Sequence, residues 1–433
     1  MSSQLLLGTP ITFPGSDKVA QSRTLKSTER LAAYSDKLDE RGIPGEKLVR
    51  LYSAWSEGGL GLIITGNIPI DRTGLEAKGN VIIDAKSPWN PVEHLKPLIA
   101  AAKAHGSLVI GQLTHGGRQT PIEVNPQPVS SSDVQAPPSM GLTFGKPRPL
   151  EVSEIDDLIK AWGYGAKVLY EAGADGAQLH SAHGYLLSQF LSGRVNQRTD
   201  EYGGPLENRA RIVRRVVEEI KKQVPDPNFL LSIKINSQDF ADKGLTLEES
   251  KEVCKWLDEA GLHLIELSGG TYESWAVFDH KSEHTKNREA YFVEFADAIK
   301  PAIKHARLAV TGGFRSKKGM EEALHGSTDI VGLARPLTSE PHLIRDILEG
   351  RTEGAKENKV PASKQTTTCI YSMRCMANGQ PLPDLSDKAT AEATLAAALG
   401  QKPEDKPAGE GHDTTQSYEK GNPGGLDAEE DEV

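Results

Sequence analysis

Short apolar runs alternate with longer amphipathic runs along the chain from Thr24 to Leu348. Each apolar run has the length of a strand, and several are almost continuously apolar, as strands buried on both faces of a parallel sheet are. This pattern predicts eight strands: Thr24–Thr28, Leu60–Thr65, Leu108–Leu113, Asp175–Leu179, Leu230–Ile235, Leu262–Leu267, Leu308–Thr311 and Ile330–Leu333.

The stretches between these strands have the apolar spacing of amphipathic helices. The third predicted helix begins at Ser153 and the fifth at Thr246, and both residue types are suitable N-caps. Thr246 and Glu249 also have the spacing of a capping box. The predicted helices are Glu46–Gly58, Trp89–His105, Ser153–Ala172, Pro205–Gln223, Thr246–Ala260, Glu289–His305, Lys317–Leu324 and Glu340–Leu348.

Eight successive strand–helix units predict an α/β fold of the TIM (β/α)8 barrel type. A doubly wound sheet is the other architecture that such alternation allows, but it predicts a Gly-rich nucleotide loop after the first strand, and none occurs there. We expect the barrel over residues 1–355, a C-terminal extension over 356–387, and a low-complexity acidic tail over 388–433.

The acidic charge is concentrated near the C-terminus. Of the formal net charge of −10, the stretch Gln401–Val433 contributes 10 acidic residues against 3 Lys, or −7, which leaves −3 for the rest. This stretch is rich in Gly and Pro and has almost no large aliphatic side chains, so we expect it to be disordered. The Ala-rich run Lys388–Leu399 before it is expected to form a loose helix.

The overall composition limits the possible binding partners of the protein and the compartment in which we expect it. The negative charge argues against nucleic acid or an anionic membrane surface as a partner, and no segment has the apolar length of a membrane span. The three cysteines, Cys254, Cys369 and Cys375, form no C-x-x-C pair, which disfavours an iron–sulfur or Cys-rich zinc site. With no convincing signal peptide at Met1–Phe13, we expect a cytoplasmic protein, and the oligomeric state stays open.

A long segment rich in Pro, Ser and Gly, Gly116–Leu150, follows the third predicted strand. Loops after barrel strands lie on the face that carries the active site, so this segment is a candidate lid. The other interpretation is a surface loop that has no role in the active site.

The ends of the last predicted strands have the composition of a phosphate site. Gly312 and Gly313 follow the seventh strand, and Ala334 and Arg335 follow the eighth. Glycine exposes backbone N–H groups to an anion, Arg adds a bidentate charge, and these two loops are the usual phosphate position in a TIM barrel. A glycine pair alone is more often a simple turn, so only the glycines together with Arg335 and their place in the fold predict a phosphate site.

Gln112 and Lys234 are polar residues within otherwise apolar predicted strands. A Gln offers both a donor and an acceptor, and a Lys offers a positive charge, a combination that suits the pyrimidine edge of a flavin. The other interpretation of Lys234 is a salt bridge inside the barrel, with Glu266 as the partner.

His180, His183 and Tyr185 come directly after the fourth predicted strand. Two imidazoles can hold a carbonyl oxygen, and a phenol beside them is a candidate proton donor. The H-x-x-H spacing also occurs at zinc sites, but a strand end is not a helical setting, and no third ligand is evident. A purely structural role is the third interpretation.

The chain resembles the Old Yellow Enzyme family of FMN-dependent ene-reductases from about Arg23 to Glu349. The most specific match is HSAHGYLLSQFLSGRVNQRTDEYGGPLENR, from His180 to Arg209. Supporting matches are EGGLGLIITGN, GQLTHGGRQ, IKINSQDF, ELSGGTYE, VTGGFRS and GLARPL.

The resemblance implies a role for each residue that matches a family motif. His180 and His183 match the pair that binds the substrate oxygen, and Tyr185 matches the proposed proton donor. The implied FMN contacts are Thr28 near flavin O4 with Ser27 beside it, Gly66 beside the ring, Gln112 and Lys234 on the ring, and Gly313, Ala334 and Arg335 at the phosphate, next to Gly312.

The implied activity is reduction of the C=C bond of an α,β-unsaturated carbonyl compound, an enone or enal. NAD(P)H would reduce the FMN, flavin N5 would deliver hydride to the β-carbon, and Tyr185 would protonate the α-carbon. A relative of the dienoyl-CoA reductases is a rival, but the cysteine cluster and extra domains of those enzymes are absent from this sequence.

Two positions depart from the family pattern. The first strand, SRTLKSTERLA, is two residues shorter than in relatives, and Gly193 replaces a usual proline. The shortened strand leaves a second function class open, a flavin-free barrel that acts as a binding or scaffold protein.

Overall fold

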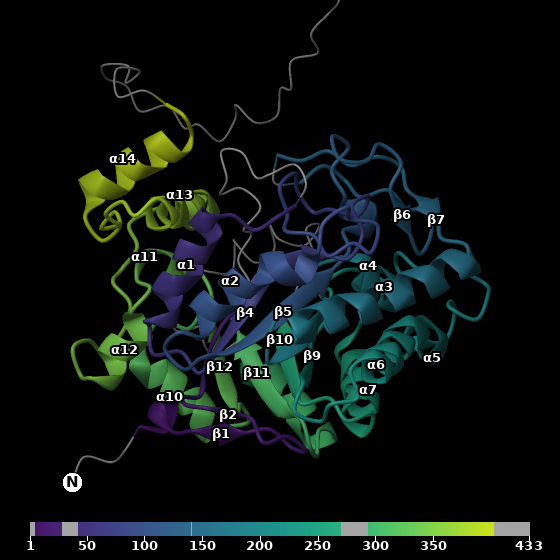
Figure 1. The fold of residues 1–433 in the computed structure, drawn as a ribbon, viewed down its shortest axis with the longest axis horizontal. Coiled ribbons are helices and arrows are strands. Elements are labelled where there is room, and N and C mark those ends of the chain that lie inside the picture. Colours follow the sequence, from purple (N-terminus) through teal and green to yellow (C-terminus); the bar gives the residue numbers. More distant parts are fainter. Residues whose placement is uncertain (1–4, 28–41, 140, 270–292, 402–433) are drawn as a thin grey trace, which may run out of the picture.

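The computed structural model describes residues 5–27, 42–139, 141–269 and 293–401. Figure 1 shows strands at the centre of the molecule with helices outside them, and α13 (Gln365–Ala377) and α14 (Lys388–Ala398) at the upper left. The predicted first-strand residue Thr28 and the acidic segment 402–433 lie outside the described residues.

Eight parallel strands form a closed barrel, which confirms the predicted fold class. Around the barrel the strands follow the order β10-β11-β12-β3-β4-β5-β8-β9, and β3 closes the ring by pairing with β12. Their bounds are β3 Thr24–Lys26, β4 Leu62–Pro69, β5 Leu108–Thr114, β8 Gly176–Ser181, β9 Leu230–Asn236, β10 Leu264–Ser268, β11 Arg307–Thr311 and β12 Ile330–Leu333.

Helices follow the barrel strands and cover the outside of the ring (Figure 1). They are α1 Glu46–Ser56, α2 Pro91–Lys103, α3 Val152–Glu171, α4 Leu186–Leu191, α5 Leu206–Arg209, α6 Arg211–Gln223, α7 Leu247–Glu259, α10 Lys317–His325, α11 Pro336–Ser339 and α12 Leu343–Leu348. Of the helix predicted over Glu289–His305, residues 293–299 are described and helical. Short 3-10 turns complete the set: η1 Leu6–Gly8, η2 Gly117–Gln119, η3 Lys300–Ala302 and η4 Ala362–Lys364.

The helix predicted from Trp89 begins at Pro91, after the N-cap Asn90, and two other predicted starts also differ from the structure. The N-cap of α3 is Glu151 and not Ser153, because Glu151 and Glu154 form a reciprocal capping box. The helix predicted from Glu340 begins at Leu343, because Glu340 is the C-cap of α11, with the non-helical angles φ −129° and ψ 71°. The capping box at Thr246 is confirmed.

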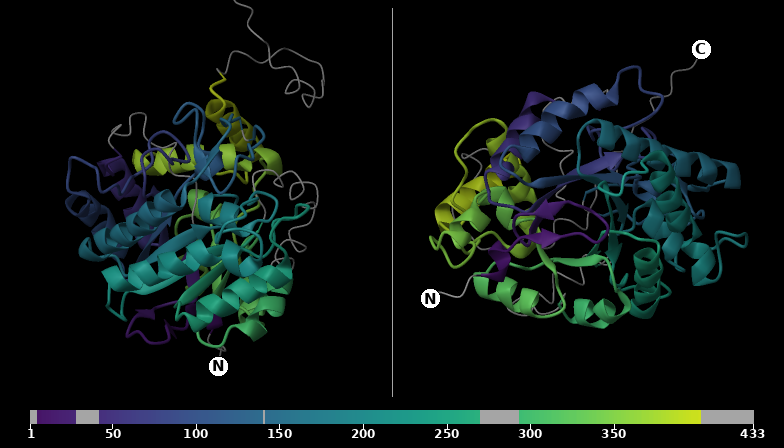
Figure 2. Two further views of the ribbon diagram at one scale, coloured as in Figure 1. Left: turned by 90° about the vertical axis from the view of Figure 1, so that its right-hand side faces the viewer. Right: turned by 60° about the horizontal axis from the view of Figure 1, so that its bottom comes forward.

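An apolar layer fills the amino-terminal half of the barrel. Its members come from the barrel strands, from the antiparallel pair β1 (Ile11–Thr12) and β2 (Val19–Ala20), and from Phe13 directly after β1. This pair crosses the amino-terminal opening of the ring (Figure 2, right). The layer consists of Ile11, Phe13, Ala20, Leu25, Leu62, Ile64, Leu108, Ile110, Leu230, Leu264, Ala309 and Ile330.

The segment after β5 is tied down at the opposite, carboxyl-terminal end. It contains the short parallel pair β6 (Val129–Ser130) and β7 (Arg148–Pro149). The Ser130 hydroxyl donates to Gln189 Oε1 on α4 at 2.9 Å, and the Arg198 guanidinium donates to the Leu150 carbonyl at 2.6 Å. The segment therefore packs directly on α4, beside the candidate site, and its role as a lid stays a prediction.

Two helices beyond the barrel pack on its side. Helix α13 (Gln365–Ala377) contacts α1 and α11, and Arg50 of α1 donates to the carbonyl of Ala377 at 3.1 Å. Helix α14 (Lys388–Ala398) contacts α13, and its Ala391 packs with Val360 and Leu385. The predicted loose helix thus packs on the extension, at the upper left of Figure 1.

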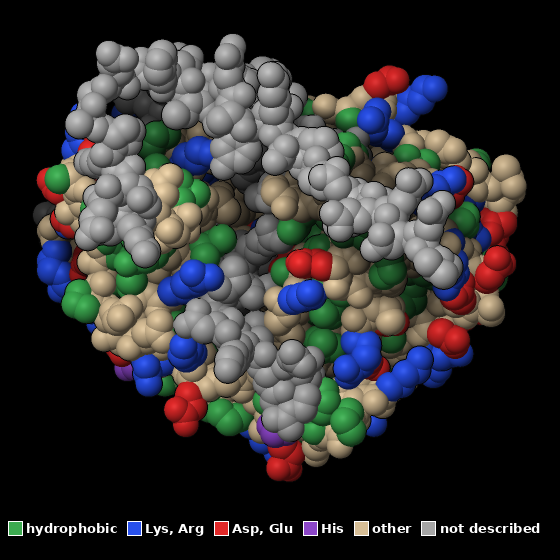
Figure 3. All heavy atoms as spheres, turned by 90° about the horizontal axis from the view of Figure 1, so that it is seen from above, with side chains coloured by type: hydrophobic (Ala, Val, Ile, Leu, Met, Phe, Trp, Pro, Cys, Tyr) green, Lys and Arg blue, Asp and Glu red, His purple; other side chains and the backbone are tan. Residues whose placement is uncertain are grey.

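The molecule seen from the carboxyl-terminal side carries interspersed basic and acidic side chains (Figure 3). Among the helices of the described ranges, none is both long and apolar enough to cross a membrane.

Candidate active site

A buried polar layer lies above the apolar layer of the barrel, and Glu266 of β10 is its centre. Its carboxylate accepts hydrogen bonds from Ser27 at 2.5 Å, Thr311 at 2.7 Å and Gln178 at 2.9 Å. The ammonium of Lys234 lies 3.0 Å from Glu266 Oε1 and also donates to the Ser27 hydroxyl at 2.8 Å. The salt bridge that the sequence left open for Lys234 therefore exists.

The pairing of Glu266 with Lys234 sets the charge state of this layer. Burial alone would raise the pKa of Glu266, but the charge of Lys234 and the hydrogen bonds from Ser27, Thr311 and Gln178 bring it below its ordinary value. Glu266 is therefore ionised at neutral pH, and it holds the ammonium of Lys234 at a fixed place below the barrel mouth.

Gln112 extends the same layer toward β4 and β5. Its Nε2 donates to Gln178 Oε1 at 2.7 Å, whereas its buried Oε1 has no hydrogen-bond partner among the described residues. The buried Oδ1 of Asn67 likewise has no partner there. Buried acceptors without donors are costly, so these amides fit a ligand that presents N–H groups, as the pyrimidine ring of a flavin does.

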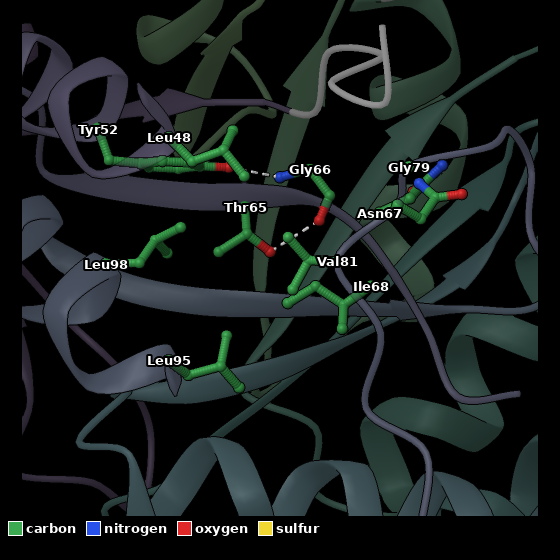
Figure 4. A pocket seen from close by; sticks show the side chains of 11 residues that line it. Leu48, Tyr52, Thr65, Gly66, Asn67, Ile68, Gly79, Val81, Leu95 and Leu98 are labelled. Carbon is green, nitrogen blue, oxygen red and sulfur yellow. Dashed lines mark hydrogen bonds between the residues drawn. The ribbon is translucent and has the colours of Figure 1, made fainter. Parts of the chain in front are cut away.

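Gly66 lies at an irregularity of β4. The register with β5 shifts between Ile64 and Asn67, and the Thr65 hydroxyl accepts the Gln112 N–H at 2.9 Å. The Gly66 N–H donates to the hydroxyl of Tyr52 on α1 at 2.7 Å (Figure 4). The small cavity of Figure 4 lies between β4 and the helices α1 and α2, and Gly66 and Asn67 are among the residues that line it.

His180, His183 and Tyr185 come together at the carboxyl end of β8. The ring centroids of His180 and His183 are 5.1 Å apart, and those of His180 and Tyr185 are 4.7 Å apart, both edge to face. His183 and Gly184 have positive φ angles of 59° and 79°, and this turn brings Tyr185 back beside His180. The structure therefore brings together all three predicted side chains.

Both imidazoles are neutral at physiological pH. Burial lowers the pKa of His180 well below its ordinary value, and the charges of His183 and Lys234 act in the same direction. Burial and Lys234 lower the pKa of His183 to about 3, against a smaller opposite effect of Glu266. His180 Nδ1 accepts the Ala182 N–H at 3.3 Å, which places the ring proton on Nε2. His183 Nε2 lies 2.8 Å from the Ser268 hydroxyl.

The sequence prediction missed one residue in contact with this group. The Tyr185 hydroxyl donates to Oε2 of Glu76 at 2.5 Å, and both residues are buried. Glu76 belongs to the loop between β4 and α2, in a polar stretch with no motif that distinguishes it. Only its position opposite Tyr185 identifies it.

The predicted phosphate residues line a single open cavity at the ends of β11 and β12. Gly312, Gly313, Ala334 and Arg335 are among the residues that line this cavity, which has a volume of about 650 Å³. Gly313 has a φ of 78°, and the Arg335 side chain makes no hydrogen bond or ion pair within the described ranges. The extension adds Gln365 to the wall of this cavity. Exposed backbone and an unengaged guanidinium fit a phosphate group.

Of the two FMN contacts predicted at the first strand, the structure describes Ser27 but not Thr28. Ser27 lies in the polar layer, where its hydroxyl bonds to Glu266 and Lys234. Thr28 lies outside the described residues, so its contact stays a prediction. The described ranges contain no cluster of three or more His, Cys, Asp or Glu that could hold a metal ion.

A parallel eight-stranded barrel with amide acceptors and a lysine at its mouth, and a glycine–arginine cavity beside them, is typical of flavin-binding TIM barrels. The model of the NADH:flavin oxidoreductase / NADH oxidase family matches residues 15–354. The chain therefore belongs to this family, as the resemblance of its motifs to the Old Yellow Enzymes predicted.

Individual relatives agree with this family. The chain is 38% identical over 409 residues to the NADH-dependent flavin oxidoreductase nadA of Aspergillus parasiticus, covering 91% of this chain and 90% of that protein. The old yellow enzyme homologue of Zymomonas mobilis has a TM-score of 0.67 at 24% identity, covering 81% and 94% of the two chains. A 2-naphthoyl-CoA reductase has a TM-score of 0.74 at 22% identity, and there this chain spans 58% of the longer protein.

The protein is accordingly an FMN-dependent NAD(P)H oxidoreductase of the Old Yellow Enzyme type. Membership in a flavin family favours an enzyme over the flavin-free scaffold that the shortened first strand had left open.

Proposed function

We propose that this protein reduces the C=C bond of α,β-unsaturated carbonyl compounds, enones or enals, with NAD(P)H as the hydride donor. The observation that carries the proposal is the packing of His180, His183 and Tyr185 at the carboxyl end of β8, directly above the Lys234–Glu266 pair. Such a reduction needs a site that binds the carbonyl oxygen and a proton for the α-carbon. The two imidazoles can supply the first, and the phenol can supply the second.

The two imidazoles are proposed to bind the carbonyl oxygen of the substrate. The ring proton of His180 is on Nε2, because Nδ1 already accepts a backbone N–H. Nε2 can therefore donate a hydrogen bond although the ring is neutral. Negative charge develops on this oxygen when hydride adds to the β-carbon, so donors fixed in advance stabilise the transition state more than the ground state. A neutral imidazole can do this throughout the physiological pH range.

FMN, when bound, supplies the hydride. Gln112 and Lys234 are proposed to hold its pyrimidine edge with Ser27, Thr28 and Gly66 nearby, and Arg335 with Gly312, Gly313 and Ala334 to hold its phosphate. The proton for the α-carbon is proposed to come from the Tyr185 hydroxyl, which lies against His180.

The first test is an anaerobic two-step reaction of the purified holoenzyme. NADPH or NADH is added until the flavin absorbance bleaches, and 2-cyclohexenone is then added. Return of the oxidised flavin spectrum with formation of cyclohexanone would support the proposal, and bleaching without return would reject enones as substrates. A protein that stays colourless after reconstitution with FMN would overturn the assignment of the cofactor contacts.

The role of Tyr185 has a separate test. We expect Tyr185→Phe to slow reoxidation by 2-cyclohexenone by about 10²–10⁴-fold, the usual contribution of a general acid, and to leave reduction by NAD(P)H unchanged. Equal losses in both half-reactions would contradict the assignment of Tyr185 as the acid.

A further inference from the structure

The cavity at the ends of β11 and β12 has a second wall that the barrel does not supply. Gly313 and Arg335 line it from the barrel, whereas Asn358, Ala362 and Gln365 line it from the C-terminal extension. The family match ends at residue 354, so the lining residues of the extension lie beyond the part of the chain that matches the family. The extension therefore adds polar side chains to a cavity whose other wall carries the predicted phosphate residues.

The extension is fixed to the barrel beside this cavity. Directly before the extension, the Ala355 N–H donates to the carbonyl of Arg315, in the loop after β11, at 2.7 Å. Helix α13, which begins at Gln365, packs on α11, the short helix that directly follows Arg335. The two walls are therefore brought together by contacts within the chain itself.

The backbone of Val360 fixes the orientation of both side-chain amides. Its N–H donates to Asn358 Oδ1 at 2.9 Å, and its carbonyl accepts from Gln365 Nε2 at 3.1 Å. A backbone N–H can bond only the amide oxygen and a carbonyl only the amide N–H, so neither amide can turn over without losing its bond. Val360 is 3% exposed and packs with Leu385 and with Ala391 of α14, which hold it in place.

Each amide keeps donor capacity after its bond to Val360, because an amide nitrogen carries two N–H groups. Nδ2 of Asn358 makes no hydrogen bond within the described ranges, and Nε2 of Gln365 makes only the one to Val360 there. The guanidinium of Arg335 lines the same cavity. The two walls together thus offer a guanidinium and two neutral amides, a donor set that suits an anion with several acceptor oxygens.

Two carboxylates also line the cavity, and each is paired with a lysine. Glu353 lies 2.9 Å from Lys317, and Glu357 lies 2.6 Å from Lys359. Because each carboxylate has its own ammonium group, the two oppose a bound anion less than unpaired carboxylates would.

We propose that the C-terminal extension completes the FMN phosphate site, with Asn358 and Gln365 donating side-chain N–H groups to the phosphate oxygens. This inference rests on the proposed function, which assigns the FMN phosphate to Arg335 and the glycines beside it. The affinity for FMN then depends on the packing of the extension as well as on the barrel.

The test measures the binding of FMN and of riboflavin to the full-length apoprotein by quenching of flavin fluorescence. Riboflavin has the same ring and ribityl chain but no phosphate, so it reports whether the rest of the site is intact. Asn358→Ala and Gln365→Ala should each weaken FMN binding about 10-fold, the usual effect of losing a hydrogen bond to a charged group, and leave riboflavin binding unchanged. Gln365→Glu keeps the size but puts a carboxylate beside the phosphate, so it should weaken FMN binding more than Gln365→Ala does.

Two controls accompany these variants. Gln380 is an exposed glutamine of the same extension that is not among the residues lining the cavity, so Gln380→Ala should leave both affinities unchanged. Arg335→Ala should weaken FMN binding and spare riboflavin binding, because its guanidinium is assigned to the phosphate.

The outcomes separate the extension from the cofactor assignment. Wild-type FMN affinity in either alanine variant of the extension, or an equal loss for FMN and riboflavin, would overturn the role of the extension. An Arg335→Ala variant that keeps its preference for FMN over riboflavin would place the phosphate elsewhere and overturn both assignments. These affinities do not depend on turnover, so a failure of the reaction with 2-cyclohexenone rejects the enone activity alone.

Discussion

The two halves of the barrel interior are built from opposite chemistry. The amino-terminal half is an apolar layer closed by the β1–β2 pair, with Leu264 and Ile330 among its members. The carboxyl-terminal half carries the buried pair of Lys234 and Glu266, with Gln112 beside it. β9 and β10 contribute to both layers, so a single strand stabilises the fold at one end and presents polar groups at the other. Changes in the two halves should therefore have separable effects on stability and on flavin chemistry.

The largest effect is expected from breaking the buried ion pair. Glu266→Gln leaves the Lys234 ammonium buried without a counter-charge, which should cost about 3–5 kcal/mol of unfolding free energy. The uncompensated positive charge should also raise the midpoint potential of the flavin, because it stabilises the reduced form. Spectroscopic redox titration measures the potential, and urea unfolding measures the stability.

Asp175 provides a matched control for Glu266. Its carboxylate is 1% exposed and lies 2.6 Å from Lys18 and 2.8 Å from Lys103, at the amino-terminal end of β8. Asp175→Asn should lower stability without any change in flavin potential. An unchanged potential in Glu266→Gln would show that the pair does not act on the flavin.

A cavity in the apolar layer should affect stability alone. Leu264 is fully buried, and Leu264→Ala is expected to cost about 2–5 kcal/mol in urea unfolding. The flavin potential and the rate of reoxidation by 2-cyclohexenone should stay those of the natural protein. A shift of the potential as large as in Glu266→Gln would contradict the separation of the two halves.

The phosphate cavity allows a smaller test of the carboxyl-terminal end. Arg335→Ala should remove a charge-assisted hydrogen bond worth about 1.5–3 kcal/mol and weaken FMN binding about 10–100-fold. Fluorescence titration of the apoprotein with FMN measures this. Arg315 lines the same cavity, but its guanidinium donates to the Lys356 carbonyl. Arg315→Ala should therefore weaken FMN less, and the reverse order would reject the assignment of Arg335.

The smallest effect is expected from the pH dependence of His183. Its pKa is about 3 in the folded chain and about 6.5 when unfolded, so its stabilising effect is complete above 6.5 and declines as the pH falls toward 3. At pH 5 the unfolded state gains about 2 kcal/mol from protonation of this group. Urea unfolding at pH 7 and pH 5 should show a loss that is about 2 kcal/mol smaller in His183→Asn than in the natural protein, where His180 also contributes. The same substitution at His325, which is 70% exposed, should leave the loss unchanged.

The fold was largely predictable because its signals are local. Each barrel strand is a short apolar run, and the box at Thr246 is readable from four consecutive residues. The β1–β2 pair was missed because strands of two residues have no periodicity to detect. The cap at Glu151 was missed because Ser153, two residues later, is a better N-cap by type than a Glu.

The candidate site was predictable where a motif carried it. His180, His183 and Tyr185 lie within six consecutive positions, and the chain turn at His183 brings their rings together. Glu76 could not be found in this way, because nothing in its own segment marks it and its partner Tyr185 is 109 positions away.

The sequence alone determined the order of strands and helices, the family, and the residues that can carry flavin chemistry, because each depends on neighbours a few positions apart. Only the tertiary structure decided what those residues face. Closing the barrel placed Ser27 against Glu266, 239 positions away, and paired Glu266 with Lys234. Burial then made the imidazoles neutral and set Tyr185 against Glu76, since the charge of a group depends on the solvent and the side chains around it.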